Sequence, residues 1–148
     1  MNSLAAGIPI IIGVTGHRDL RESDEPQIRK LVYAELNKLK SKYSHSTFIM
    51  LNSLAQGGDL LCAKIALELG ISLQCPLPLP LEEYRQDFSG EVRIQFEELL
   101  NKADRYFVSE DTETSNGHSD RDYHYRQAGI YIAEHSQVLL ALWDGSKA

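Results

Sequence analysis

Short apolar runs of strand length alternate along this chain with longer stretches of helical periodicity. Residues 8–14 (IPIIIGV) are apolar and rich in β-branched side chains, as in a parallel strand buried on both faces. Within residues 24–43 apolar positions recur three and four residues apart, which predicts a helix with one buried face. The same two patterns predict strands at 47–52, 71–75, 106–108 and 138–143, helices at 59–69, 89–102 and 123–135, and a helical turn at 81–88.

Strands that alternate with helices indicate a parallel sheet that is covered by helices and joined by right-handed crossovers. We therefore predict a single Rossmann-like α/β domain over residues 1–148, a three-layer sandwich around a mostly parallel sheet of five strands or slightly more. No internal repeat, low-complexity tract or linker divides the chain. Ligands of such sheets bind outside the carboxyl ends of the strands, so each strand-to-helix junction is a candidate site.

Composition narrows the class of protein. The 148 residues include 15 Lys and Arg against 21 Asp and Glu, a formal net charge of −6, which argues against a general nucleic-acid binder. No apolar stretch approaches the roughly 18 residues of a membrane span, and residues 1–7 lack the features of a secretion signal. We therefore expect a cytoplasmic domain without membrane contact. Two cysteines, Cys62 and Cys75, exclude a disulfide scaffold and are expected to be small core residues.

The first predicted junction reads Gly-Val-Thr-Gly-His-Arg. Its two glycines, three positions apart, allow a tight turn and the close approach of a ligand to the backbone. A threonine hydroxyl and an arginine fork suit a phosphate or a carboxylate. The pattern is neither Gly-x-Gly-x-x-Gly nor a P-loop, which disfavours a standard dehydrogenase and a P-loop nucleotidase; a plain turn is the alternative. The candidate ligand contacts here are Gly13, Thr15, Gly16, His17 and Arg18.

The second junction, residues 52–59, leads into a predicted helix. Gly57 and Gly58 allow the backbone to present its amides, and a helix N-terminus attracts anions. Asp59 either caps the helix or accepts hydrogen bonds from ribose hydroxyls. Ser53 is included as a ligand contact. Since this junction and the first follow what are expected to be neighbouring strands, both are expected to face one crevice.

The third junction alternates prolines over residues 76–80, which predicts an extended loop. It is expected to form one wall of a base or ribose pocket, with Glu83 and Tyr84 as candidate contacts, or else to be a rigid connector. At the end of the fifth predicted strand, Asp144 and Gly145 form a turn that faces the same crevice.

Residues 109–122 are polar and without periodicity, which predicts a loop of unusual length. We interpret it as a lid followed by an aromatic edge, Tyr123 and Tyr125, and an anion partner, Arg126. The spacing of His118 and His124 does not match a recurring metal-ligand pattern, so we expect no metal, and we expect no resident cofactor.

Two of these segments resemble the SLOG superfamily of Rossmann-fold nucleotide-binding proteins, which joins LOG-type phosphoribohydrolases to SMF/DprA-type DNA-processing proteins. Val-Thr-Gly-His-Arg at 14–18 carries the first part of the resemblance. Ser-Leu-Ala-Gln-Gly-Gly-Asp at 53–59 is similar to the Ser-x-Ala-x-Gly-x-Asp segment of the DprA side, with its helix and a closing Gly70. Residues 76–88 and the ending Leu-Trp-Asp-Gly at 142–145 are similar to an uncharacterised bacterial branch of the group.

The resemblance covers essentially the whole chain and implies a domain that binds a nucleotide or nucleotide-derived ligand of the ADP-ribose or nucleoside-phosphate class. LOG enzymes carry a Pro-Gly-Gly-x-Gly-Thr-x-x-Glu motif that binds phosphate and supplies a catalytic acid. This chain has no such motif and stops at Ala148, where the resemblance implies that it would follow. Either the chain is truncated at its C-terminus, or this member lacks that half of the site.

Two hypotheses of function result. The favoured one is a sensor or regulatory module, in which the glycine junctions hold phosphate and Asp59 or Glu83 accepts ribose hydroxyls. The alternative is an N-glycosidic hydrolase, in which one of these two acids stabilises the oxocarbenium-like charge at the anomeric carbon. Beyond a nucleotide-like small molecule, the expected partners are further copies of the chain or a fused or associated effector domain. DNA handling is disfavoured by the acidic charge.

Overall fold

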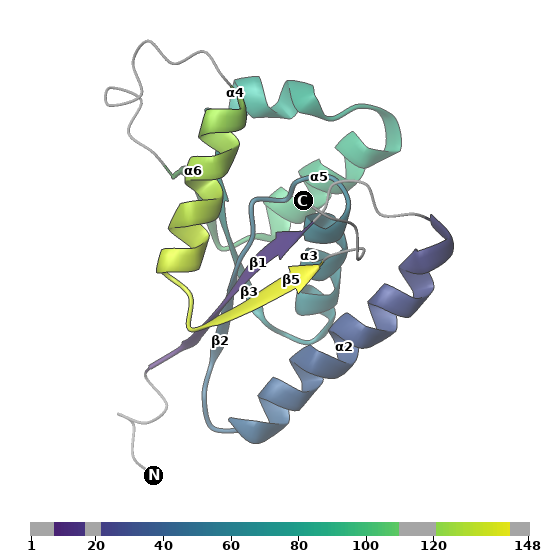
Figure 1. The fold of residues 1–148 in the computed structure, drawn as a ribbon, viewed down its shortest axis with the longest axis vertical. Coiled ribbons are helices and arrows are strands. Elements are labelled where there is room, and N and C mark those ends of the chain that lie inside the picture. The colour runs from purple at the N-terminus through teal and green to yellow at the C-terminus, as the bar shows by residue number, and fades with distance from the viewer. Residues whose placement is uncertain (1–7, 17–21, 110–120, 143–148) are drawn as a thin grey trace.

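The computed structural model describes residues 8–16, 22–109 and 121–142, and these form an α/β domain around one parallel sheet (Figure 1). The order across the sheet is β4-β3-β2-β1-β5, and every neighbouring pair of strands is parallel. The predicted five-stranded Rossmann-like sheet is therefore confirmed. The strands are β1 (Ile10–Gly16), β2 (Phe48–Leu51), β3 (Ser72–Leu77), β4 (Arg105–Val108) and β5 (Val138–Leu142).

Helices cover both faces of the sheet, which gives the three predicted layers (Figure 1). The first three crossovers run in one direction across the sheet, and right-handed connections therefore place α2, α3 and α5 on one face. The fourth crossover reverses direction to reach β5, and so places α6 on the opposite face, where it contacts β1 and β3. The helical elements are η1 (Glu22–Asp24), α2 (Glu25–Lys42), α3 (Gly58–Glu68), α4 (Leu81–Tyr84), η2 (Arg85–Asp87), α5 (Gly90–Lys102) and α6 (Arg121–Glu134).

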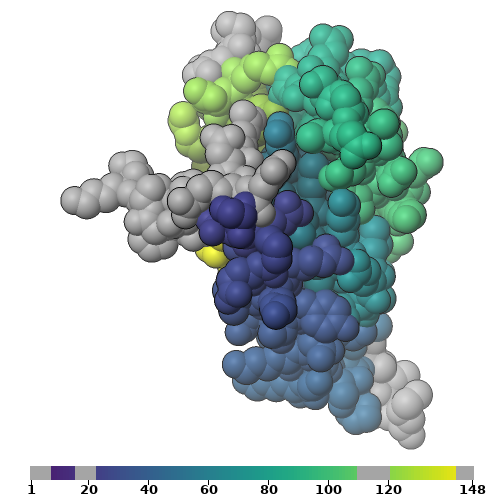
Figure 2. Space-filling model, turned by 90° about the vertical axis from the view of Figure 1, so that its right-hand side faces the viewer, coloured from purple at the N-terminus to yellow at the C-terminus, as the bar shows by residue number. Residues whose placement is uncertain are grey.

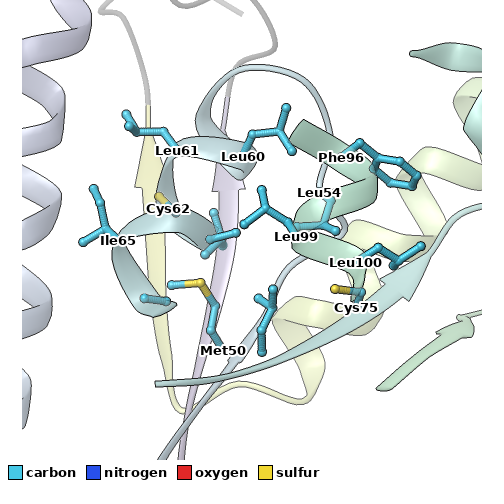
Figure 3. Close-up of a cluster of buried hydrophobic side chains, with 14 of the residues drawn as sticks. Met50, Leu54, Leu60, Leu61, Cys62, Ile65, Cys75, Phe96, Leu99 and Leu100 are labelled. Carbon is cyan, nitrogen blue, oxygen red and sulfur yellow. The ribbon is translucent and has the colours of Figure 1, made fainter. Parts of the chain in front are cut away.

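The core is built around α3, which lies between α2 and α5 and against the sheet (Figure 3). Most of its residues are buried, so it is apolar on nearly every side, as expected of a helix enclosed by neighbours. Met50 of β2, Ile65 of α3 and Leu99 of α5 meet in this cluster. The helical periodicity of α2 is confirmed, because its two buried side chains, Val32 and Leu36, lie four residues apart.

Both cysteines lie in the same core, as predicted. Cys62 of α3 and Cys75 of β3 have no exposed surface (Figure 3). Burial, and to a smaller extent the charge of Asp59, raises the pKa of each thiol to about 12. Both cysteines are therefore protonated at neutral pH and act as small hydrophobic residues.

Two predicted strands end too early, and both ends lie at the carboxyl edge of the sheet. β1 continues to Gly16, two residues beyond the predicted end, because β5 pairs with it along that length. β3 runs through Pro76 to Leu77, where an extended loop was predicted. Successive residues of β3 form their backbone hydrogen bonds alternately with β2 and with β4. Pro76, which has no backbone N–H, faces the β2 side at a level beyond the last residue of β2. The proline therefore removes no hydrogen bond from the sheet.

Candidate functional site

A crevice opens at the carboxyl ends of β1, β2 and β3, beneath α6. Its inner part is a cavity of about 140 Å³ that the strand ends share with one face of the helix. Thr15, the next-to-last residue of β1, is exposed here, so its hydroxyl is available to a ligand. The residues that line this inner cavity are Val14, Thr15, Ser53, Ala55, Asp59, Pro78, Tyr125, Ala128, Gly129 and Ile132.

A second, larger cavity of about 280 Å³ adjoins the first. Ala55 and Tyr125 line both, so together they form one site with an inner and an outer part. The outer cavity combines two carboxylates, one guanidinium, one amide and two aromatic rings. Its lining residues are Ala55, Gln56, Asp87, Phe88, Arg121, Asp122 and Tyr125.

Asn52 holds the junction between β2 and α3 in an unusual backbone conformation. This residue is not among the contacts predicted from the sequence. Asn52 is fully buried, and its side-chain oxygen accepts the Leu54 N–H at 2.8 Å. Its amide nitrogen donates to the Asp59 carbonyl, also at 2.8 Å. Leu54 has a φ of 61°, in the left-handed region that is unfavourable for a leucine. The asparagine therefore offsets local strain at the edge of the inner cavity.

One glycine of this junction, Gly57, is required by the backbone. Gly57 precedes α3 with φ 93° and ψ −122°, a combination open essentially to glycine alone. Gly58 and Asp59 are the first residues of the helix and both are buried. The carboxylate of Asp59 turns back to accept the Ala55 N–H at 3.2 Å, which closes the loop on itself. The N-terminus of α3, with its partial positive charge, thus lies beside the inner cavity.

Ser53 and Tyr84, two predicted ligand contacts, are engaged with other parts of the protein. The Ser53 hydroxyl donates to the Pro76 carbonyl at 2.7 Å, and the Tyr84 hydroxyl donates to the Ser53 carbonyl at 2.9 Å. Tyr84 is fully buried, with its ring packed edge-on against Phe88 and Phe96. Tyr84 therefore fixes the position of the junction through its buried hydrogen bond to the Ser53 carbonyl, and Ser53 lines the inner cavity.

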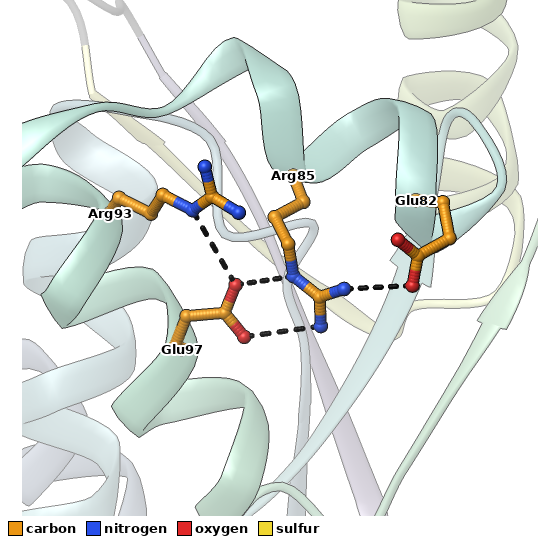
Figure 4. Close-up of polar contacts among 4 residues, drawn as sticks. All are labelled: Glu82, Arg85, Arg93 and Glu97. Carbon is orange, nitrogen blue, oxygen red and sulfur yellow. Dashed lines mark hydrogen bonds and ion pairs between the residues drawn. The ribbon is translucent and has the colours of Figure 1, made fainter.

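The segment that follows Tyr84 is anchored to α5 by a group of ion pairs (Figure 4). Arg85 contacts both carboxylate oxygens of Glu97, at 2.5 and 3.2 Å, and also reaches Glu82 at 2.8 Å. Arg93 approaches the same Glu97 at 4.0 Å. The hydrogen bond to Glu97 is the largest contribution that raises the pKa of Arg85. A bidentate pair of this kind fixes geometry as well as charge, so η2 is a defined wall of the outer cavity.

Asp87, the last residue of η2, connects this wall to α6 across the outer cavity. Its carboxylate accepts hydrogen bonds from Arg121, at 2.5 Å, and from the hydroxyl of Tyr125. Arg121 also donates to the Glu83 carbonyl at 3.3 Å. The carboxylate of Asp87 therefore joins segments that are more than thirty residues apart in the sequence. These hydrogen bonds fix the position of α6 relative to η2.

The remaining sequence-predicted residues lie in different surroundings. Gly13 is buried inside β1, where a Cβ would lie 2.2 Å from Ser136 Oγ and 2.7 Å from Ile132 Cγ2. The packing of the chain at the end of α6 therefore leaves no room for a side chain at Gly13. The side chain of Glu83 is exposed on α4, and this residue is not among those that line the two cavities.

Gly16 ends β1 beside Leu142. Tyr125, predicted as part of an aromatic edge, lines both cavities from α6, and the helix begins at Arg121, inside the predicted loop. Four predicted contacts lie outside the described residues: His17, Arg18, Asp144 and Gly145.

The described part of the chain has neither a cluster of metal-ligating side chains nor a helix suited to span a membrane. No group of three or more His, Cys, Asp or Glu side chains is arranged there to hold a metal ion. None of the helices in residues 8–16, 22–109 and 121–142 combines the length and apolar character needed to cross a membrane.

Comparison with known proteins rests on the fold. No family model matches the sequence, and no curated protein matches it. The chain is similar in structure to DNA processing protein A (DprA) from Streptococcus pneumoniae, with a TM-score of 0.60 over 95% of this chain at 15% sequence identity. The likeness shows the fold. The chain spans 43% of the length of the DprA chain.

Proposed function

We propose that this domain binds a nucleotide or nucleotide-derived ligand, of the ADP-ribose or nucleoside-phosphate class, as a sensor or regulatory module. The observation that carries the proposal is the two-part cavity at the carboxyl edge of the sheet, next to the N-terminus of α3. Its volumes of about 280 and about 140 Å³ together fall in the range of roughly 300–1,000 Å³ that small-molecule sites occupy.

The inner cavity suits the phosphate end of such a ligand. Gly57 and Gly58 bring the start of α3 to the crevice without side chains that would keep a ligand away from the backbone. The backbone N–H groups of a helix's first turn and the helix dipole favour an anion. Thr15 adds an exposed hydroxyl from the end of β1. In this proposal Gly16, His17 and Arg18 extend the phosphate contacts, with Arg18 supplying a full positive charge.

The outer cavity suits the ribose and the base. Carboxylates accept hydrogen bonds from vicinal hydroxyls, and Asp87 and Asp122 both line this space. Tyr125 offers aromatic surface for a base, whereas Phe88 is buried, with only 4% of its surface exposed. Arg121 is held by Asp87 and so has a defined position in the same wall. In this proposal the phosphate occupies the inner cavity, and the ribose and the base occupy the outer cavity.

A second function, N-glycosidic hydrolysis of a nucleotide, is favoured by one observation. Asp59 is nearly buried, with 8% of its surface exposed, and lines the inner cavity, so in this alternative the ribose occupies the inner cavity and its anomeric carbon lies near the carboxylate. Glu83, the other candidate acid, is exposed on α4. If the domain is an enzyme, we assign the acid role to Asp59. Product analysis of wild type and Asp59→Asn after incubation with AMP distinguishes a hydrolase from a sensor, because only a hydrolase releases ribose 5-phosphate.

A filled cavity tests the binding proposal. Gly129 lines the inner cavity, and a Cβ added there would meet no heavy atom within 4 Å. Gly129→Leu therefore occupies space at the cavity wall without a clash at Cβ, and Gly129→Ala is the matched control. Thermal-shift measurements with AMP, ADP-ribose, NAD and cyclic nucleotides should find a ligand that stabilises wild type and Gly129→Ala but not Gly129→Leu. Equal stabilisation of all three proteins would contradict the proposal.

A further inference from the structure

One short segment of the chain supplies a wall of both cavities. It comprises residues 53–59, which lead from the end of β2 into the first turn of α3. Ser53, Ala55 and Asp59 line the inner cavity, and Ala55 and Gln56 line the outer cavity. The shape of the whole site therefore depends on the backbone conformation of the 53–59 segment.

The conformation of the 53–59 segment is unfavourable for its own sequence. Leu54 has a φ of 61°, in a left-handed region that a leucine populates roughly 5- to 30-fold less than the right-handed region. The Leu54 side chain is fully buried, so a glycine could replace it only with a loss of core packing. Strain of this kind persists only where the surrounding structure fixes the backbone, and it is concentrated at functional sites. The segment therefore requires a supporting group beside Leu54.

The support comes from Asn52, which a ligand cannot reach. Asn52 is fully buried and is not among the residues that line the two cavities. Its side-chain oxygen accepts the Leu54 N–H, and its amide nitrogen donates to the Asp59 carbonyl, both at 2.8 Å. Its own backbone N–H donates to the Gln74 carbonyl of β3 at 3.0 Å. One side chain thus ties both ends of the 53–59 segment to the sheet.

An asparagine suits this position because its side chain both donates and accepts. A neutral amide has an acceptor oxygen and N–H donors, whereas a carboxylate only accepts and an aliphatic side chain does neither. Asp59 adds a second closure, since its carboxylate accepts the Ala55 N–H at 3.2 Å. The 53–59 segment is therefore held by contacts within the protein itself.

We propose that Asn52 is the positioning residue of the ligand site, which holds the 53–59 segment in its binding conformation before a ligand arrives. The inference rests on the proposed function, because it concerns the affinity for a nucleotide. With the segment already in place, binding does not have to order it. Without the Asn52 side chain only a fraction of the molecules has the correct wall, and the apparent affinity falls by that fraction.

A variant of similar instability separates positioning from a general loss of stability. Leu36→Ala is the matched control, because a core leucine truncated to alanine and a buried asparagine removed from its partners both destabilise a protein substantially. Leu36 is fully buried on α2, the blue helix that Figure 2 turns toward the viewer. It lines neither cavity, and its helix covers the face of the sheet opposite α6.

Amide hydrogen exchange of the ligand-free chain tests the support of the backbone. In Asn52→Ala the Leu54 amide should exchange about tenfold faster or more, relative to the Ile12 amide in the buried strand β1, because it loses its acceptor. In Leu36→Ala the two amides should accelerate together, so their ratio stays at the wild-type value. A Leu54 amide that is equally protected in wild type and Asn52→Ala would overturn the proposal.

Calorimetric titration with AMP and with ADP-ribose, at a temperature where every variant is folded, tests the effect on binding. Asn52→Ala should bind about tenfold more weakly than wild type, in line with the unfavourable conformation of Leu54, and Leu36→Ala should bind as wild type does. Asn52→Ser has a hydroxyl that can accept from the N–H two residues on, although more weakly than an asparagine. Its affinity should lie between the two, and this variant carries the test if Asn52→Ala does not fold.

The outcomes separate this proposal from the function on which it rests. A wild type that binds neither AMP nor ADP-ribose would overturn the proposed function and this proposal together. A wild type that binds a nucleotide no better than the Asn52 variants would overturn this proposal alone, as would equal losses of affinity in Asn52→Ala and Leu36→Ala.

Discussion

Gly13→Ala tests the placement of α6 over the sheet, because this glycine lies where β1 meets the end of that helix. A Cβ at this position would be 2.2 Å from Ser136 Oγ, 2.7 Å from Ile132 Cγ2 and 3.0 Å from Ser136 Cβ. All three distances are shorter than any normal carbon contact. The two neighbours have little freedom to move, since Ser136 donates to the Ile132 carbonyl at 2.5 Å and Ile132 is only 3% exposed. The helix must therefore shift away from the strand.

The expected loss of stability follows from two opposing effects. Overpacking a well-filled core costs about 1–3 kcal/mol. The loss of backbone freedom in the unfolded chain returns about 0.4–1 kcal/mol at a site where the backbone suits alanine. We expect a net destabilisation of about 1–2 kcal/mol, which for a chain of this length lowers Tm by about 2–8 °C. Urea unfolding followed by circular dichroism measures the free energy directly.

Two controls distinguish the steric explanation from a general effect of the substitution. Gly129→Ala makes the same change on α6, where no atom lies within 4 Å of the new Cβ, and should stabilise the protein by about 0.5–1 kcal/mol through helix propensity. Ser136→Ala removes one of the clashing atoms and should recover part of the loss in Gly13→Ala. If Gly13→Ala is as stable as wild type, the close approach of α6 to β1 is refuted.

Three further predictions concern the junction beneath the site and the buried thiols. Tyr84→Phe removes the hydrogen bond to the Ser53 carbonyl and should lower the free energy of unfolding by about 1–2 kcal/mol; an unchanged urea midpoint would exclude that role. Asn52→Ala leaves two buried backbone groups without their partner and should lower it by about 2–4 kcal/mol, a larger loss than Tyr84→Phe. The pKa of Cys62 and of Cys75 is raised from 9.0 to about 12, so the folded state holds its protons more tightly than the unfolded state. Each protonated thiol therefore stabilises the folded state fully below pH 9. This contribution to the free energy of unfolding falls by about 1.4 kcal/mol per pH unit for each thiol as the pH rises toward 12. Urea midpoints measured from pH 8 to 10.5 should therefore fall less steeply in Cys62→Ala than in wild type, and parallel curves would contradict the assignment.

The hydrophobic pattern was sufficient to predict the fold, because short β-branched apolar runs mark strands buried on both faces and a three-and-four spacing marks helices with one buried face. It was less reliable at strand ends, where pairing with a neighbour decides the boundary. β1 extends to Gly16 because β5 continues beside it. Pro76 stays within β3 because its missing donor faces the side where β2 has already ended. Neither fact can be inferred from local sequence, since each depends on which strands are neighbours.

The inner part of the site was predicted better than the outer part. Glycines and an acid after a buried strand are recognisable as a junction, and Thr15 and Asp59 do line one cavity. The outer cavity depends on Asp87 meeting Arg121, which is 34 residues away in the chain and on a different helix. No spacing rule links such residues, and only the placement of α6 brings them together.

The claim on which the proposed function depends is that a nucleotide occupies the crevice between α6 and the strand ends. Titration of the isotope-labelled protein with AMP and with ADP-ribose, followed by amide chemical shifts, tests it most directly. We predict saturable shifts confined to the backbone around Thr15, Ala55, Gly57 and Tyr125, with little change along α2. Shifts that fail to saturate with either ligand, or that centre on residues far from this crevice, would contradict the account.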